Sequence, residues 1–192
     1  MDDARITELA LRAREGDRAA AGEFVALTQH QIHRLLVHLA DPGVAEELAQ
    51  ETYERAFTSL RGYRAEAPAR SWLLAIARRV AVDHQRRRAR RPAVATPIAD
   101  DDRPLHGAGA PGSDPAETVA LRRAVGGLDP DRREAFVLTQ VVGLSYEQAA
   151  EVCRCPIGTI RSRVARARAD LVAALDDRAG SGTTGHRPGR LG

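Results

Sequence analysis

Residues 145–171 carry the pattern that most restricts the fold, because it requires two helices joined by a tight turn. Ser145 and Gln148 have the spacing of a capping box, which predicts a short helix from there to about residue 152. A second helix is expected over about 157–175, where apolar residues recur at three-to-four spacing: Ile160, Val164, Ala167 and Leu171. Small and apolar residues occupy the positions where the helices meet: Ala149, Ala150, Val152, Cys153, Cys155 and Ile157. We interpret this unit as a helix-turn-helix; a helical hairpin within a larger bundle is the alternative.

The opposite face of the second helix has the character of a DNA-reading surface. Because successive helical residues are rotated by about 100°, this face carries the residues that avoid the apolar stripe. They are Ser162, Ala165, Arg166 and Ala169, flanked by Arg161 and Arg163. Residues 154–168 contain five Arg and no acidic residue. A small, arginine-bearing face without carboxylates fits the major groove of DNA.

The rest of the chain also reads as helix, because aromatic residues make up only 4% and the apolar residues follow helical spacing. Helices are expected at 5–14, 17–40, 44–60 and 72–90, the last with Ser71 as its N-cap. After residue 116, Asp129 and Pro130 predict a helix start and Gly143 a helix end. Residues 92–116 hold five of the ten prolines, three glycines and a run of three Asp, a composition typical of a flexible linker.

These patterns predict an all-α chain of two small helical domains. The expected division is a first domain at 1–91, a flexible linker at 92–116, a second domain at 117–177 and a disordered tail at 178–192.

Charge is distributed unevenly along the chain, although the formal net charge is only +3. Residues 70–91 carry eight Arg and one acidic residue, Asp83, whereas residues 1–60 carry eleven acidic residues and six Arg. Together with the basic stretch at 154–168, this indicates two contacts with nucleic acid and a separate contact with protein. The alternative is that these charges simply solvate exposed helix faces.

Residues 155–168, Cys-Pro-Ile-Gly-Thr-Ile-Arg-Ser-Arg-Val-Ala-Arg-Ala-Arg, resemble region 4.2 of the extracytoplasmic-function (ECF) sigma factors of the sigma-70 family. Residues 128–136 and 143–150 resemble the rest of the fourth domain of that family. In the other half, residues 45–56 are similar to region 2.2, and residues 70–78 with Asp83-His84 are similar to regions 2.3 and 2.4. The likeness covers about 17–90 and 117–175, with both halves in the family's order.

The resemblance implies a sigma factor, which binds core RNA polymerase and directs promoter-specific transcription initiation by recognising −35 and −10 elements and assisting DNA melting. It implies that the β′ clamp helices of the polymerase contact Leu48, Gln50, Glu51, Tyr53 and Arg55. The residues implied at the −10 element are Trp72, Arg78, Arg79, Asp83, His84, Arg86 and Arg87. The residues implied at the −35 element are Arg154, Thr159, Arg161, Ser162, Ala165 and Arg166.

Arg79 and Arg154 depart from the family's pattern, and Trp72 fits two different roles. Arg79 stands where region 2.4 often has Asn, and Arg154 stands where the turn usually has Gly, so we expect a less tight turn. Trp72 lies beside the arginine cluster and beside an apolar stripe. It fits a platform for unstacked bases, with loop 61–70 holding a flipped base, and it fits a core position equally well.

The remaining expectations concern binding partners, cellular location and chemistry. Family resemblance implies contacts with the polymerase β flap and with promoter DNA, and an anti-sigma factor as regulator. The sequence shows no apolar run long enough for a membrane span and no signal peptide, which predicts a cytoplasmic protein. Cys153 and Cys155 are interpreted as small apolar residues of the turn, since zinc needs four ligands and no His lies nearby. We expect no cofactor, no metal and no small-molecule substrate.

Two other functions compete with the sigma factor. The first is a helix-turn-helix transcriptional regulator that acts without core polymerase and binds a palindrome as a dimer. The second is a nucleic-acid-processing enzyme, which requires clustered carboxylates or a nucleophile paired with a base. Neither arrangement is visible in the sequence, so we expect a protein that is not an enzyme.

Overall fold

The computed structural model describes residues 2–90 and 115–181, and in the second stretch the side chains of 119–176. Every element in these ranges is helical, which confirms the all-α prediction. The N-terminal half (residues 2–90) contains α1 (Asp3–Arg14), α2 (Arg18–Leu39), α3 (Ala45–Ser59) and α4 (Ala69–Arg90), with short 3-10 turns at Pro42–Val44 and Leu60–Gly62. The C-terminal half (residues 115–181) contains α5 (Pro115–Gly126), α6 (Pro130–Phe136), the π-helical turn η3 (Val137–Val141), α7 (Tyr146–Cys153) and α8 (Ile157–Ser181).

The N-terminal half is a four-helix arrangement around an apolar core. Side-chain caps start the first two helices: Asp2 accepts from the backbone of α1, and Asp17 accepts from the backbone of α2. Helices α2, α3 and α4 pack on one another, and α1 packs on α2 and α4. The largest fully buried side chains in this half are apolar: Ile6, Leu9, Phe24, Ile32, Leu35, Leu36, Leu48, Leu73, Leu74 and Val80. Ser71 is not the cap we expected, because α4 already begins at Ala69 and encloses Ser71 in its first turn.

The C-terminal half contains the helix-turn-helix that the sequence predicts. Asp129 caps α6 with Pro130 at its first position, and Ser145 with Gln148 forms the capping box of α7. The apolar stripe of α8 faces inward and is buried at Ile160, Val164, Ala167 and Leu171. These elements therefore begin where local capping chemistry predicts, within the scatter usual for helix ends.

The ends of the second half differ in part from the expected boundaries. Most of the expected linker, residues 92–114, lies outside the described residues, and helix begins again at Pro115. At the other end α8 continues to Ser181, so the start of the expected tail at 178–192 is helical, and residues 182–192 lie outside the described residues.

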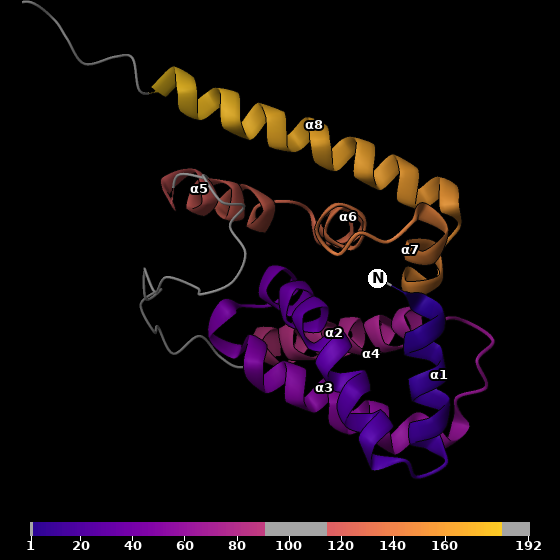
Figure 1. Ribbon diagram of the computed structural model, residues 1–192. Helices are drawn as coiled ribbons and strands as arrows, with labels where there is room; N and C mark the ends of the chain where they lie inside the picture. The colour runs from indigo at the N-terminus through magenta and orange to yellow at the C-terminus, as the bar shows by residue number, and fades with distance from the viewer. Residues whose placement is uncertain (1, 91–114, 182–192) are drawn as a thin grey trace, which may run out of the picture.

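The two halves pack against each other through one side of the C-terminal half. Helix α7 contacts α4, and η3 and α5 contact α2. Figure 1 shows α8 running along the other side, with α5, α6 and α7 between it and the N-terminal helices. In the described parts of the chain, no helix has the length and apolar character needed to cross a membrane.

Candidate nucleic-acid interface

The outer face of α8 presents the side chains expected at the −35 element. Arg161, Ser162, Ala165 and Arg166 are exposed, and Thr159 is half-buried. The neighbouring arginines behave differently, because Arg163 pairs with Asp131 and Arg168 donates to the Gln140 side chain at 2.8 Å. Arg161 and Arg166 are therefore the exposed arginines on this face that are best placed to approach DNA.

The turn of the helix-turn-helix is closed by a non-glycine residue in a left-handed conformation. Arg154 has φ 53° and ψ 48°, and its backbone N–H donates to the carbonyls of Ala150 and Glu151. The next residue, Cys155, also donates to the Ala150 carbonyl, at 3.1 Å. The expectation of a less tight turn is therefore wrong, because Arg154 adopts the conformation that glycine usually supplies.

Cys153 lies on the inner side of this turn. It is buried, and burial with the nearby Glu134 carboxylate raises the pKa of its thiol well above the ordinary range. Cys153 and Cys155 are both free thiols. A buried, protonated thiol acts as a small apolar residue, in agreement with the sequence interpretation.

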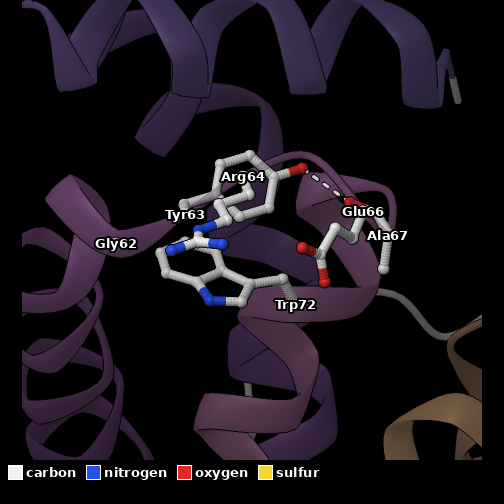
Figure 2. Close-up of a pocket in the computed structure, with 6 residues that line it drawn as sticks. All are labelled: Gly62, Tyr63, Arg64, Glu66, Ala67 and Trp72. Atoms are coloured by element: carbon white, nitrogen blue, oxygen red, sulfur yellow. Dashed lines mark hydrogen bonds between the residues drawn. The ribbon is translucent and has the colours of Figure 1, made fainter.

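A hollow of about 440 Å³ lies beside the start of α4, where Figure 2 shows the side chains of Arg64, Glu66 and Trp72. Tyr63 forms the back of this hollow: its ring lies 4.9 Å from that of Trp72, measured between centroids, and its hydroxyl donates to the Ala67 carbonyl at 2.7 Å. Trp72 is half-buried and packs against the core. Both alternatives for Trp72 therefore stay open, since one part of the indole is packed and another lines an open hollow.

The arginines of α4 differ in exposure and in their partners. Arg79, Arg86 and Arg87 are exposed, whereas Arg78 forms a two-point ion pair with Glu134 of the C-terminal half. Arg70 is buried and bonds to other parts of the protein. Of the remaining residues expected at the −10 element, Asp83 and His84 are half-buried.

Of the five residues of α3 expected to meet the polymerase, two are exposed, two are half-buried and one is buried. Gln50 and Arg55 are exposed and Glu51 is half-buried, and Tyr53 shares a hydrogen bond of 2.8 Å with Thr28. Leu48 is the correction in this set: it is only 1% exposed and packs in the core, so its side chain is not part of the surface. In the apolar pattern of α3, Leu48 occupies an inward-facing position.

The structure also links two residue sets that the sequence kept separate. Arg55 of α3 pairs with Glu51 at 2.5 Å and with Asp83 of α4 at 3.0 Å, and Arg87 of α4 reaches Glu51 at 3.3 Å. The pair with Asp83 raises the pKa of Arg55, and Glu51 adds to this. Residues expected to bind polymerase and residues expected to bind −10 DNA thus share one row of charges.

Sequence reasoning missed several residues of these surfaces. Phe57 of α3 is 38% exposed and Leu27 of α2 is 41% exposed, although no sequence pattern marked either as a surface residue. The Tyr63 and Arg64 side chains lie in a loop, where no periodicity marks them. Among the described residues, no three His, Cys, Asp or Glu side chains are arranged to hold a metal ion.

Comparison with known proteins gives consistent results over both halves. Residues 24–91 match the family model "Sigma-70 region 2", and residues 118–171 match "Sigma-70, region 4". The chain is 44% identical over 177 residues to the ECF RNA polymerase sigma factor SigC of Mycobacterium tuberculosis, covering 90% of this chain and 92% of the relative.

Two solved structures share the fold over most of the chain. CnrH in complex with the cytosolic domain of CnrY is similar with a TM-score of 0.69 and 27% identity, over 92% of this chain and 99% of that chain. The sigma factor RpoE in complex with the anti-sigma factor NepR from Bartonella quintana is similar with a TM-score of 0.65 and 28% identity, over 81% and 96%.

Proposed function

The chain belongs to the sigma-70 family of RNA polymerase sigma factors, in its ECF group, and from this membership we propose which of its surfaces contact polymerase and promoter. As an ECF sigma factor it binds core RNA polymerase and DNA and acts in promoter-specific transcription initiation. A sigma factor is not an enzyme, so its function depends on surfaces that bind rather than on groups that react.

The outer face of α8 binds the −35 element in this proposal. Arg161 and Arg166 are exposed on an acid-free face, with the small side chains of Ser162 and Ala165 between them. Small residues let the helix enter the major groove, and the two guanidinium groups can each donate two hydrogen bonds to a guanine edge. Thr159 and Arg154 lie near the turn, where the backbone of DNA passes. This exposed face is the observation that carries the proposal.

The start of α4 and the loop before it bind the −10 element. The hollow beside Trp72 offers an aromatic wall, the Arg64 guanidinium and the Glu66 carboxylate to a base turned out of the helix. Exposed arginines of α4, namely Arg79, Arg86 and Arg87, supply the positive charge that a single strand needs. Asp83 and His84 lie beside them on the same helix.

Helix α3 contacts core RNA polymerase. Gln50, Glu51 and Arg55 offer polar and charged groups, and Tyr53 packs its ring against exposed Phe57 with centroids 6.4 Å apart. An exposed aromatic ring that packs on a half-buried one and is rimmed by charges is typical of a protein interface. We leave Leu48 out of this surface, because it lies in the core.

The remaining expectations stay proposals. The chain has separately folding domains at 1–91 and 117–177, it acts in the cytoplasm, and it contacts the β flap as well as the β′ clamp helices. An anti-sigma factor regulates it; this is supported by the similar structure of RpoE, which is bound to one.

Run-off transcription with core RNA polymerase on a library of promoter fragments tests the proposal. We expect initiation only when the chain is added, at fragments that share a −35 and a −10 sequence. The competing function, a regulator that acts without polymerase, predicts no initiation and no co-purification with core polymerase. Sequencing the active fragments would also supply the two DNA elements for the experiments below.

A further inference from the structure

The two arginines that depart from the family's pattern line one hollow. Arg79 of α4 and Arg154 at the end of α7 both border a space of about 290 Å³ where these helices meet. Both residues are exposed, and in the described part of the chain neither guanidinium has a hydrogen bond or an ion pair. Region 2.4 often has Asn and the turn usually has Gly at these positions, so the shared fold requires neither arginine.

Both arginines are unfavourable where they stand. Arg154 has a φ of 53°, in the left-handed region that suits glycine and is strained for a residue with a Cβ atom. Arg79 adds a second positive charge to the same hollow, and like charges repel each other. An anion bound between the two guanidinium groups compensates for both costs, because arginine forms strong, charge-assisted hydrogen bonds with phosphate and carboxylate.

The lining of the hollow also includes a buried hydroxyl group without a partner. Ser71, in the first turn of α4, is 3% exposed, and its Oγ has no hydrogen bond to any described residue. A helical serine commonly donates to the carbonyl four positions earlier, but that carbonyl, of Ala67, accepts from the Tyr63 hydroxyl. Because an unpaired buried hydroxyl is unfavourable, a ligand in the hollow that accepts its hydrogen bond gains affinity.

The other lining residues indicate which kind of anion fits. Trp72, Ala75, Ile76 and Val152 form an aromatic and apolar wall, against which a planar ring can pack. Glu151 is the one carboxylate among the lining residues, and it is exposed. A carboxylate repels phosphate but accepts hydrogen bonds from ribose hydroxyls, as it does in dinucleotide sites. A phosphate, a planar base and a ribose together describe a nucleotide.

We propose that this hollow binds a free ribonucleoside 5′-monophosphate. The phosphate lies between Arg79 and Arg154 and accepts from Ser71 Oγ, the base packs against Trp72, and the ribose hydroxyls donate to Glu151. The inference goes beyond the proposed function, because it adds a small-molecule ligand that neither promoter DNA nor polymerase supplies. Each half contributes one of the two arginines, so neither half contains the whole site.

The fluorescence of Trp72 reports binding directly, because it is the only tryptophan in the chain. The full chain is titrated with AMP, GMP, CMP and UMP, and isothermal titration calorimetry detects any binding that leaves the fluorescence unchanged. We expect at least one monophosphate to bind. Its nucleoside, which lacks the phosphate, its 2′-deoxy form and inorganic phosphate should all bind more weakly. If none of the four binds by either method, the proposal is overturned.

Charge removal at the two arginines tests where the phosphate lies. Arg79→Gln and Arg154→Gln should each weaken binding of the monophosphate by roughly tenfold or more, because each removes hydrogen bonds to a charged group. Arg86→Gln and Arg161→Gln are the matched controls, since they remove the same charge at exposed positions that do not line the hollow. An equal loss in all four variants would mean that positive charge attracts the nucleotide without a site, which contradicts the proposal.

Ser71→Ala separates binding from stability. The variant removes a hydroxyl that has no partner, so without ligand its urea midpoint should equal or exceed that of the wild type. Its affinity for the monophosphate should fall, because the phosphate loses a donor. Wild-type affinity of Ser71→Ala would show that the buried hydroxyl faces no ligand, and the proposal would lose the observation that marks this hollow as a site.

The hollow beside Tyr63 is the alternative place for the nucleotide, because Trp72 lines it as well. Arg64→Gln changes that hollow alone and should leave the affinity for the monophosphate unchanged. A loss confined to Arg64→Gln would place the nucleotide there and overturn the proposal. Stronger binding of the dinucleotide ApA than of AMP would also overturn it, because the ligand would then be a nucleic-acid strand. Run-off transcription tests the proposed function separately, so a chain that initiates at promoters and binds no monophosphate refutes this inference alone.

Discussion

The two halves of the molecule present their DNA surfaces in different ways. In the C-terminal half the proposed surface is one face of a single helix, α8, and its reading side chains Arg161 and Arg166 are exposed. In the N-terminal half the proposed surface combines a loop, the hollow beside Trp72 and the arginines of α4, and Arg78 is bound to Glu134 of the other half. One surface is ready to bind, and the other is partly engaged inside the protein.

Under the proposed function, this difference means that the −35 and −10 elements are read by different physical means. A helix face reads the edges of paired bases, so each arginine acts at one base pair. A hollow with an aromatic wall accepts an unpaired base, so its contribution is stacking and depends on melting of the DNA. Substitutions should therefore change sequence preference in the C-terminal half and overall −10 affinity in the N-terminal half.

The largest effect is expected for Trp72→Ala. Loss of base stacking should weaken −10 single-strand binding by about 1–3 kcal/mol. The half-buried ring also packs on Tyr63, so the same variant should unfold at lower urea concentration. Trp72→Phe keeps an aromatic face and should retain most of both properties. Anisotropy and urea unfolding measure the two effects, and Trp72→Ala with wild-type −10 affinity would make the indole a core residue only.

The next effect concerns the comparison of Arg166 with Arg168 on α8. Arg166→Ala, or Arg161→Ala, should cost about 1–3 kcal/mol on the preferred −35 sequence and broaden the preference at one base pair. Arg168 bonds to Gln140 and lies nearer the inward stripe, so Arg168→Ala should weaken all sequences alike and lower the salt slope by about one. Affinities for single-base −35 variants at two salt concentrations decide this. A change of preference in Arg168→Ala alone would mean that the helix faces DNA with another side.

A charge reversal on α3 tests the N-terminal half at its polymerase surface. Glu51→Arg should weaken binding to core polymerase about tenfold, which corresponds to about 1.4 kcal/mol, because it reverses a charge and repels Arg55 and Arg87. Glu54→Arg makes the same change at an exposed neighbouring position and should have less effect. Binding of the −35 duplex should be unchanged in both. Equal core affinity for Glu51→Arg and the wild type would count against this surface.

The sequence predicts the surface of the C-terminal half better than that of the N-terminal half. The face of a single helix follows from local periodicity, whereas a surface built from a loop and several helices does not. In α8 the apolar stripe fixes the inward face, so the exposed residues follow from periodicity, and Ser162 and Arg166 are exposed as predicted. Capping signals at Asp129 and Ser145 gave the helix starts correctly, because caps are local interactions.

The features that could not be predicted depend on contacts between residues that are distant in the sequence, and no local pattern contains such contacts. Arg78 and Glu134 lie 56 positions apart, so nothing in either segment predicts their pairing. Leu48 is buried and Phe57 is exposed because the packing of α2 and α4, and not the amphipathic pattern of α3 alone, decides which row of α3 is covered. The hollow at Tyr63 depends on a loop that periodicity cannot describe.

A smaller effect is expected at the turn of the helix-turn-helix. Arg154 has a left-handed conformation that costs a side-chain-bearing residue energy, so Arg154→Gly should stabilise the fold by about 0.5–1 kcal/mol. The same variant should bind −35 DNA more weakly, because it removes a guanidinium. Urea unfolding and anisotropy of the −35 duplex measure the opposite changes. If Arg154→Gly were less stable than the wild type, the Arg154 side chain would stabilise the fold by more than its left-handed backbone conformation costs.

The smallest effect concerns acid pH at the contact between α2 and α5. Burial, with the charges of Arg122 and Arg34, lowers the pKa of His38 below its ordinary value. The unfolded chain takes up a proton at the ordinary pKa and the folded chain resists it, so stability is lost as pH falls below about 6.5. Urea midpoints at pH 7.5 and 5.5 should differ more for the wild type than for His38→Gln. Equal differences would mean that other groups cause the acid sensitivity.

The π-helical turn has a consequence for exchanging halves between relatives. The carbonyls of Val141, its last residue, and of Val142, the next residue, accept from arginines that lie 107 and 72 positions earlier in the chain. A chimaera that joins this C-terminal half to an N-terminal half without Arg34 and Arg70 would keep the side chains proposed for −35 DNA and lose the donors to these two carbonyls. Such a chimaera should recognise the same −35 sequence, while its two halves should pack less firmly on each other. The halves are therefore expected to be interchangeable as readers of DNA, but not as packing partners.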